Sequence, residues 1–131
     1  MEIDKIAYIE IREGKILCTK SFGKNTYYIP GGKRDPGETD EETLVREVKE
    51  ELDVAIRPTT IEFVGIFKAQ AHGKAEGVKV KMSCYKAEFE GTLKPSNEIE
   101  EIRWLTMADI DLVSYVDVKI FNYLHEKGEL T

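Results

Sequence analysis

The 131-residue sequence predicts one domain, over residues 1–131, of the α/β (α+β) class, in which a mixed β-sheet is flanked by helices. Three observations support this prediction. The length is that of one ordinary domain, apolar β-branched segments outnumber helical ones, and the two kinds of segment interleave. A composition of 41% hydrophobic and 34% charged residues, with ten glycines and four prolines, excludes a collagen-like, low-complexity or wholly disordered chain.

The first part of the chain is expected to form three strands. Residues 3–11 are rich in apolar and β-branched side chains, residues 12–15 are typical of a turn, and residues 16–19 form the returning strand. A polar loop leads to a short strand at residues 27–29. We expect this strand to stop at the bend Pro30-Gly31-Gly32.

A helix is predicted from Thr39 to about Leu52. Thr39 and Glu42 have the T-x-x-E spacing of a capping box, in which each side chain binds the other residue's backbone N–H. At 100° per residue, four apolar side chains share one stripe, which must pack on the sheet: Leu44, Val45, Val48 and Leu52.

The second half of the chain is expected to continue the sheet and end in a helix. Residues 61–69 and 78–89 predict a hairpin, and the apolar side chains change face after Cys84, which indicates a bulge or burial on both faces. Residues 102–106 predict another strand. The chain turns helical from Met107, and its last amphipathic helix carries Val118, Ile120, Phe121 and Leu124.

The net charge of −6 is distributed unevenly along the chain. Residues 35–53 include nine acidic and two basic side chains, whereas the rest of the chain holds 16 acidic and 17 basic ones. A chain of this charge is not expected to coat nucleic acids. The acidic segment therefore either uses its charge or tolerates it at the surface.

Three carboxylates of the predicted helix share an arc about 100° wide, apart from the apolar stripe: Glu47, Glu50 and Glu51. Like charges three and four residues apart destabilise a helix by roughly 0.2–0.5 kcal/mol per pair. Mg²⁺ would offset this repulsion, because it prefers oxygen ligands, and carbonyls of the Pro30-Gly31-Gly32 bend would add to them. The segment lacks an EF-hand loop and the sulfur or imidazole ligands of zinc. The competing interpretation is a solvated acidic surface that binds no metal.

These residues also carry a resemblance to a known family. Gly32, five residues, Glu38, seven residues and then the segment 46–54 (REVKEELDV) resemble the Nudix box, G-x5-E-x7-R-E-U-x-E-E-x-G-U, where U is aliphatic. Only Asp53 departs, standing where the family usually has glycine, and Asp tolerates the left-handed conformation that ends a helix. The sequence is thus similar to the MutT-like members of the Nudix hydrolase superfamily, and the expected strand order extends the likeness to the Nudix-type α/β/α sandwich.

The resemblance implies a Mg²⁺-dependent or Mn²⁺-dependent hydrolase that cleaves the pyrophosphate of a nucleoside diphosphate linked to another group. It implies that Glu38 supports the metal site from its loop, that Arg46 fixes the carboxylates by ion pairing, and that Glu47 or a neighbour activates the attacking water. By the same resemblance, a late-loop carboxylate often joins the site, and Glu98 is the best candidate, with Glu100 and Glu101 behind it. The implied metal ligands are Glu47, Glu50, Glu51, the Gly31 carbonyl and Glu98.

Other residues are candidates for substrate contact. Lys33 and Arg34 adjoin the glycine bend and are expected to touch phosphate. His72 is a candidate to approach the substrate or act as a general base, although we favour a plain surface position for it, and Glu76 is a second candidate base. Four aromatic residues would either stack on a nucleobase or, as we favour, pack in the core: Phe22, Tyr27, Tyr28 and Trp104.

The expected partner is a nucleotide or another small pyrophosphate, and neither a nucleic-acid polymer nor a membrane. The chain has no apolar stretch of membrane-spanning length and starts without a secretory signal. Cys18 and Cys84 fit no metal or redox motif, so we expect two buried strand cysteines in a reduced, cytoplasmic protein. Exposed strand edges are compatible with a homodimer. The alternative function is a Nudix-fold nucleotide-binding or sensor module without turnover.

Overall fold

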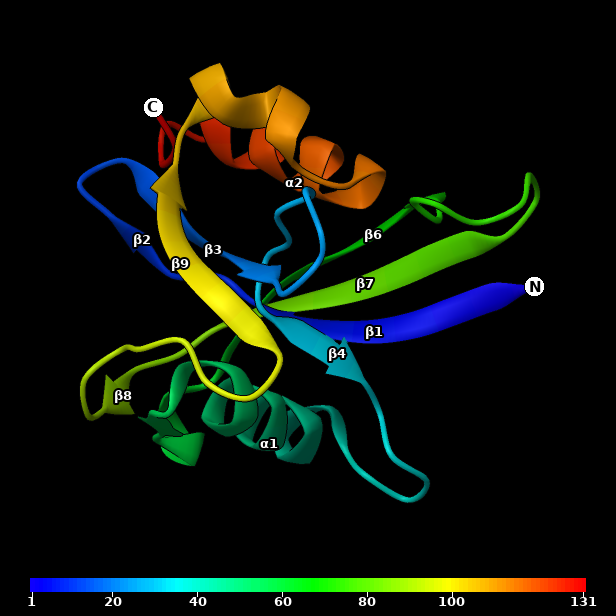
Figure 1. Ribbon diagram of the computed structural model, residues 1–131. Coiled ribbons are helices and arrows are strands. Elements are labelled where there is room, and N and C mark those ends of the chain that lie inside the picture. The colour runs from blue at the N-terminus through cyan, green and yellow to red at the C-terminus, as the bar shows by residue number, and fades with distance from the viewer.

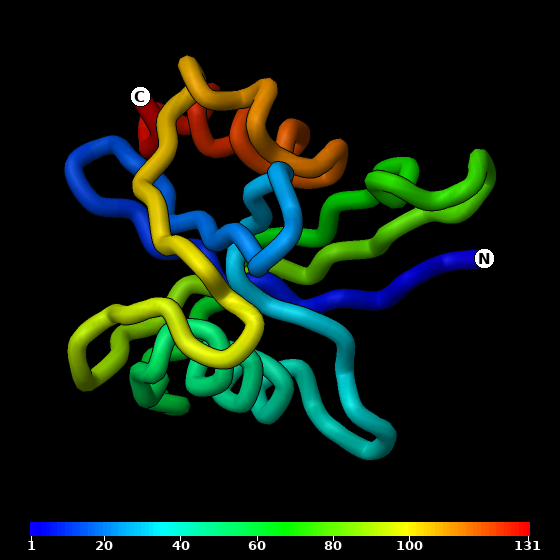
Figure 2. The backbone as a smooth tube through the Cα atoms, in the orientation of Figure 1, coloured from blue at the N-terminus to red at the C-terminus, as the bar shows by residue number.

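The computed structural model covers residues 1–131 and forms a sandwich, with sheets between helix α1 (Asp40–Leu52) and helix α2 (Tyr115–Glu126) (Figure 1). Figure 2 shows the C-terminal end beside the turn between the second and third strands. There the Thr131 N–H donates to the Gly14 carbonyl at 2.8 Å. The predicted α/β/α arrangement is confirmed.

The main sheet has four strands in the order β4-β1-β7-β6, and it is mixed as predicted. Strand β1 pairs in parallel with β7 and antiparallel with β4, while β6 and β7 pair antiparallel. The bounds are Glu2–Tyr8 for β1, Gly31–Lys33 for β4, Glu62–Gln70 for β6 and Lys79–Lys86 for β7.

A second sheet has the order β2-β3-β9, and the loop that leads into β9 passes in front of helix α1 in Figure 1. Its strands are β2 (Ile11–Arg12), β3 (Lys15–Ser21) and β9 (Ile99–Leu105). Two shorter strands form a separate pair, β5 (Ala55–Ile56) with β8 (Phe89–Glu90). Two 3₁₀ helices complete the fold, at Pro58–Thr60 and Met107–Leu112.

Several strand boundaries differ from the prediction. The strand expected over residues 78–89 stops at Lys86, and the strand expected over 102–106 begins at Ile99. The strand expected over residues 3–11 stops at Tyr8, and Ile11 begins a strand in the other sheet. The strand expected at residues 27–29 is wrong, because Tyr27 and Tyr28 make only isolated bridges and the Ile29 N–H donates to a carboxylate of α2. The bend at Gly31 and Gly32 is instead the start of β4, which pairs with β1.

The expected bulge is present, but it lies in the partner strand. The register between β6 and β7 shifts between Phe63 and Gly65, opposite Cys84 and Tyr85. Burial on both faces of β7 is also confirmed, because the consecutive residues Met82, Ser83 and Cys84 are all buried. Cys18 and Cys84 are buried strand residues with free thiols, as expected.

Helix α1 packs on the sheet with the predicted stripe. Leu44, Val48 and Leu52 are completely buried in a core that they share with Ile6 and Tyr8 of β1. Val45 is partly buried against the same core. A larger core lies under α2 on the other side of the main sheet. The side of the helix that carries Glu47 and Glu51 therefore faces β4.

Both predicted ends of α1 are confirmed. Thr39 and Glu42 form the complete capping box, and Asp53 ends the helix in the left-handed conformation, with φ of 57°. Asp53 also accepts an ion pair from Lys49 at 3.1 Å. No helix of the structure has the length and apolar character that a membrane span requires.

Candidate active site

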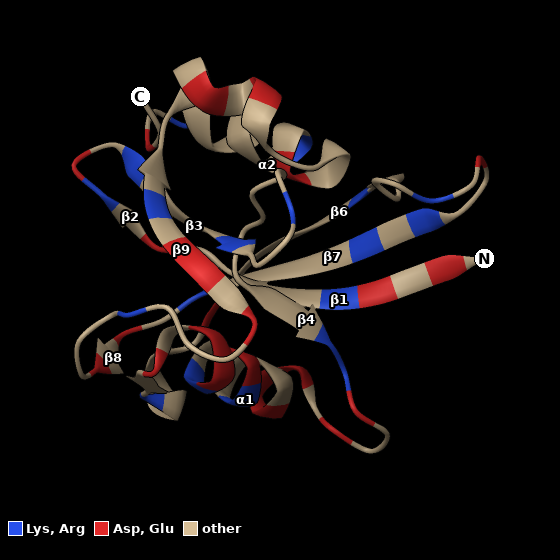
Figure 3. Ribbon diagram, viewed as in Figure 1, with Lys and Arg blue, Asp and Glu red and all other residues tan.

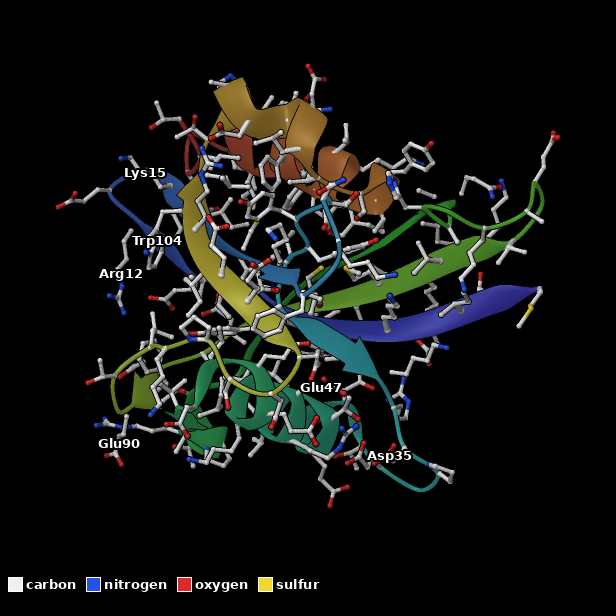
Figure 4. All side chains as sticks on the ribbon, in the orientation of Figure 1. Arg12, Lys15, Asp35, Glu47, Glu90 and Trp104 are labelled. Carbon is white, nitrogen blue, oxygen red and sulfur yellow. The ribbon has the colours of Figure 1, made fainter.

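The site forms where α1 faces the two glycines of β4 (Figure 4). An ideal Cβ on Gly32 would lie 2.5 Å from the carboxyl carbon of Glu47, so only glycine leaves room for that carboxylate. Gly31 has φ of 146°, and a Cβ there would overlap the Ile6 carbonyl oxygen. The two glycines therefore let the backbone of β4 approach both the carboxylates of α1 and strand β1.

Glu51 is the most deeply buried carboxylate of α1, with 7% of its surface exposed. The Gly31 N–H donates to its Oε1 at 3.3 Å, and it makes no ion pair. Burial, together with the charges of Glu47, Glu98 and Glu50, raises the pKa of Glu51 to about 8, although the bond from the Gly31 N–H acts in the opposite direction. Burial also raises the pKa of Glu47. The site thus holds negative charge that nearby cationic side chains only partly balance.

Arg46 is the main cation of the site. Its Nη1 donates to Glu47 at 2.9 Å and to Glu50 at 3.4 Å, and its Nη2 donates to the Lys33 carbonyl at 3.0 Å. The same guanidinium makes two bonds to Glu38, at 2.8 and 2.9 Å. Arg46 therefore joins the helix, the end of β4 and the loop between them.

Glu38 is fastened on all sides rather than free to react. Besides Arg46, it accepts from the Asp35 N–H at 2.8 Å and from the Thr43 hydroxyl at 2.9 Å. The bonds from Arg46, followed by the Asp35 N–H, lower the pKa of Glu38 to about 2. This carboxylate stays ionised and holds Arg46 in place. Figure 3 shows how acidic residues gather on α1 and on the loop that precedes it.

Glu98 lies in the loop before β9, and this loop is attached to the end of α1. The Ser96 N–H donates to the Glu51 carbonyl at 3.1 Å, and the Asn97 side chain donates to the Glu50 carbonyl at 2.9 Å. Glu98 is exposed, and its charge raises the pKa of both Glu47 and Glu51. The structure thus brings this late carboxylate to the same side as the helix carboxylates.

The donor set fits a hard divalent cation by its chemistry. Buried carboxylates of raised pKa gain from a nearby cation, because it favours their ionised form, and a cavity of about 200 Å³ leaves space beside Glu51 and the glycines. No three acidic, histidine or cysteine side chains converge tightly enough to enclose one ion, and Arg46 holds Glu47 and Glu50.

The two basic residues after the glycines are placed differently. Arg34 forms ion pairs with Asp4, at 2.7 Å, and with Asp40, which also accepts from the Tyr85 hydroxyl. Its guanidinium therefore links β1, α1 and β7. Lys33 is exposed, pairs in register with Lys5 of β1 and makes no ion pair. Lys33 is the freer of the two for a phosphate.

Two cavities adjoin the site. A cavity of about 200 Å³ is lined by Gly31, Gly32 and Glu51. A larger cavity of about 420 Å³ extends toward the loop between β6 and β7 and is lined by His72. Both are lined by Tyr28, whose ring lies 5.8 Å from the Lys5 Nζ. Tyr28 thus lines both cavities, and His72 lines only the larger one.

Other candidates lie away from the carboxylates. Glu76 is exposed in the loop between β6 and β7 and makes neither an ion pair nor a hydrogen bond. Tyr27 is buried in the core under α2, and Trp104 packs against the core under α1, which bears out the preference for packing at these two positions. Phe22 is 64% exposed and belongs to neither core.

Two titratable residues in this region were not predicted from the sequence, the fully buried Asp117 and the partly buried Lys5. Asp117 of α2 accepts from the Ile29 N–H at 3.0 Å. Its spacing to Ile120 and Phe121 places it on the apolar face of α2, a signal that was present in the sequence. Lys5 lies two residues from both Ile3 and Ala7, which places it on the same face of β1 as these apolar side chains.

Comparisons with known proteins agree with this geometry. The family model of the NUDIX domain matches residues 5–124. The NAD-capped RNA hydrolase NudC of Pseudomonas putida is 34% identical over 101 residues, which cover 76% of this chain and 34% of that protein. The RNA pyrophosphohydrolase of Pseudoalteromonas translucida is 36% identical over 56 residues, covering 43% of this chain and 31% of that protein. The matches thus span about a third of the length of these curated relatives.

A solved structure extends the likeness to the whole fold. The MutT NUDIX hydrolase from Burkholderia pseudomallei superposes with a TM-score of 0.72 and 21% sequence identity, covering 100% of this chain and 99% of that chain. The match of the family model covers most of the chain and includes the glycines, the helix and its carboxylates. The chain belongs to the NUDIX domain family.

Proposed function

We propose that the protein hydrolyses the pyrophosphate linkage of a nucleoside diphosphate joined to another group, with Mg²⁺ or Mn²⁺ as cofactor. The observation that carries this proposal is the set of carboxylates Glu47, Glu50 and Glu51 on one helix. Glu47 lies against Gly32, Glu51 accepts from the Gly31 N–H, and Arg46 holds Glu47 and Glu50. Relatives named as an NAD-capped RNA hydrolase and an RNA pyrophosphohydrolase support cleavage of a nucleotide pyrophosphate.

The cation would be held by Glu47, Glu50, Glu51, Glu98 and the Gly31 carbonyl. Such an ion offsets charge on the pyrophosphate oxygens and lowers the pKa of a bound water. Arg46 keeps Glu47 and Glu50 beside the glycines, and Glu38 keeps Arg46 in place. Pyrophosphate hydrolysis depends largely on such positioning and on electrostatics.

The chain's own residues supply the proton acceptor and the phosphate contact. Glu47 is the base that we propose, because it lies against Gly32 at the mouth of the site and is oriented by Arg46. Lys33 extends from the same strand and would bind a phosphate oxygen. His72 and Glu98 are the alternative bases, since His72 lines the adjoining cavity and Glu98 lies beside Glu51. Glu76 contacts none of these groups, so we rank it last among the candidate bases.

A substrate panel tests the proposal. Nucleoside diphosphates and triphosphates, oxidised nucleoside triphosphates, sugar nucleotides, dinucleoside polyphosphates and a 5′-triphosphorylated RNA would each be incubated with Mg²⁺ or Mn²⁺, and phosphate and nucleotide products would be measured. We expect turnover of at least one small nucleotide. Saturable binding without turnover would support the alternative, a nucleotide-binding sensor, whereas a calorimetric Mn²⁺ titration with no saturable site would support an acidic surface.

We also propose a cellular compartment and an oligomeric state for the protein. The unpaired thiols of Cys18 and Cys84 suit a reducing compartment, which we take to be the cytoplasm. We propose a single domain over residues 1–131 that acts on small nucleotides. Strand β6 is the edge of the main sheet opposite β4 and would be the contact of a homodimer, which light scattering would detect.

A further inference from the structure

The larger cavity, about 420 Å³, is basic, although the protein as a whole has a net charge of −6. None of the residues that line it is acidic. We call it the distal cavity, since the glycines of β4 line only the smaller one. Its lining includes three lysines and one histidine: Lys5, Lys24, Lys74 and His72.

The distal cavity continues the smaller cavity at the glycines. Four residues line both, so the two spaces adjoin: Lys5, Ser21, Tyr28 and Met82. Lys5 is at this junction and makes no ion pair or hydrogen bond. Burial lowers the pKa of Lys5, and the charge of Asp117, which lines neither cavity, partly opposes this effect. An anion at the junction would supply the partner that Lys5 lacks.

The wall of the distal cavity also holds a polar atom without a partner. The Nδ1 atom of His72 is buried and makes no hydrogen bond, whereas the Nε2 atom of the same ring pairs with the Thr26 hydroxyl at 3.3 Å. Buried polar groups of folded proteins are nearly always hydrogen-bonded, so this atom is open to a polar ligand. Lys24 and Lys74 stand at the exposed end of the cavity, and neither side chain is engaged elsewhere.

The geometry points to a substrate with a second phosphate group, separate from the pyrophosphate that is cleaved, which occupies the distal cavity beside Lys24 and Lys74. This inference rests on the proposed function for the position of the pyrophosphate. A phosphate suits the cavity because lysine is a compact, mobile charge that binds phosphate oxygens well. The second phosphate is either a monoester on the nucleoside or the phosphodiester of a following nucleotide.

Three substrates and two variants test the inference. The substrates are a nucleoside 5′-triphosphate, the same compound with a 3′-phosphate, and a 5′-triphosphorylated dinucleotide. The variant Lys24→Gln/Lys74→Gln removes two cavity charges, and Lys15→Gln removes an exposed, unpaired lysine at the turn between β2 and β3 (Figure 4). Steady-state kinetics with Mg²⁺ would give KM and kcat for the wild-type protein and each variant with each substrate.

We expect the wild-type protein to have a lower KM for at least one doubly phosphorylated substrate than for the plain triphosphate. The double variant should raise that KM about tenfold, the loss expected for charge-assisted bonds. It should leave kcat and the KM of the plain triphosphate unchanged. Lys15→Gln should change nothing. If the double variant raises KM more for the 3′-phosphorylated compound, the occupant is the monoester. If it raises KM more for the dinucleotide, the occupant is the phosphodiester.

Equal KM values for all three substrates, or an equal effect of the double variant on all three, would overturn the inference. Equilibrium binding of the same compounds in EDTA separates this result from a failure of the proposed function. If no substrate is cleaved but the double variant still weakens binding of the doubly phosphorylated compounds alone, the anion cavity stands and the hydrolase proposal falls.

Discussion

Single side chains in this protein are placed by partners that lie far away in sequence. Asp117 of α2 binds the backbone of Ile29, and Glu51 of α1 binds the backbone of Gly31, so the short segment between them is held by two carboxylates from opposite sides. Both carboxylates have a raised pKa because they are buried. They differ in surroundings, since Glu51 has other carboxylates near it and Asp117 has the cation Lys5.

The catalytic assignment predicts the effect of removing one charge at a time. Glu50→Gln or Glu51→Gln should lower turnover by at least about 10²-fold, the order expected when a metal ligand or positioned group is lost. The glutamine side chain preserves shape, so the fold should persist, as circular dichroism would show. Glu76→Gln is the control and should retain full turnover. Near-normal kinetics of both site variants at saturating Mg²⁺ would contradict the assignment.

Asp117 predicts a dependence of stability on pH. Burial raises its pKa to about 7, well above the ordinary value near 4, so the folded protein binds a proton more tightly than the unfolded chain. The contribution of Asp117 to the free energy of unfolding is therefore largest below about pH 4 and is lost as pH rises through 7. Asp117→Asn keeps an oxygen for the Ile29 N–H and removes this titration.

Urea denaturation at a series of pH values in EDTA would measure the effect. We expect Asp117→Asn to be more stable than the wild-type protein at pH 8 by on the order of 1–3 kcal/mol, and to lose this advantage near pH 4. The control is Asp111→Asn, a change of an exposed acid on the preceding 3₁₀ helix. Parallel curves of the free energy of unfolding against pH for Asp117→Asn and the wild type would contradict the raised pKa of Asp117.

Whole elements were predictable where their signals are local. Helix α1 was found with its limits because Thr39 and Glu42 mark its start, the apolar stripe recurs within four turns, and Asp53 adopts the left-handed end. The carboxylates that share this helix were grouped for the same reason. The segment 27–29 was assigned wrongly because its backbone partner, Asp117, comes from the last helix. Strands β5 and β8 have two residues each, which is too short for any alternation to show.

The packing of α1 predicts how its two kinds of face respond to substitution. Leu44→Ala and Val48→Ala remove completely buried side chains and should lower the free energy of unfolding by about 1–4 kcal/mol, as cavities do. Val45→Ala, at a partly buried position of the same helix, is the matched control and should cost less. Unchanged thermal midpoints in the first two variants would show that the helix faces are misassigned.

At the scale of the whole molecule, the site joins three parts of the chain that only the complete fold brings together. Glu51 and Gly31 connect α1 with β4, and the loop before β9 is bonded to the end of α1 through Ser96 and Asn97. Lys5 of β1 and His72, which follows β6, complete the adjoining cavities. Sequence spacing could group the carboxylates of one helix, but it could not show that these remote segments meet.

Because the site exists only in the folded chain, a cation that binds there should stabilise the whole molecule. For a dissociation constant on the order of 1 mM, 10 mM Mn²⁺ adds about 1.4 kcal/mol, which corresponds to roughly 4–7 °C in Tm for a domain of this size. The gain should disappear in Glu47→Gln and Glu51→Gln, and it should persist in Glu76→Gln, whose lost charge is equal but lies in the loop between β6 and β7. Differential scanning calorimetry with and without Mn²⁺ would measure these shifts. An equal shift in all three variants would mean that Mn²⁺ acts through the overall negative charge rather than at these carboxylates.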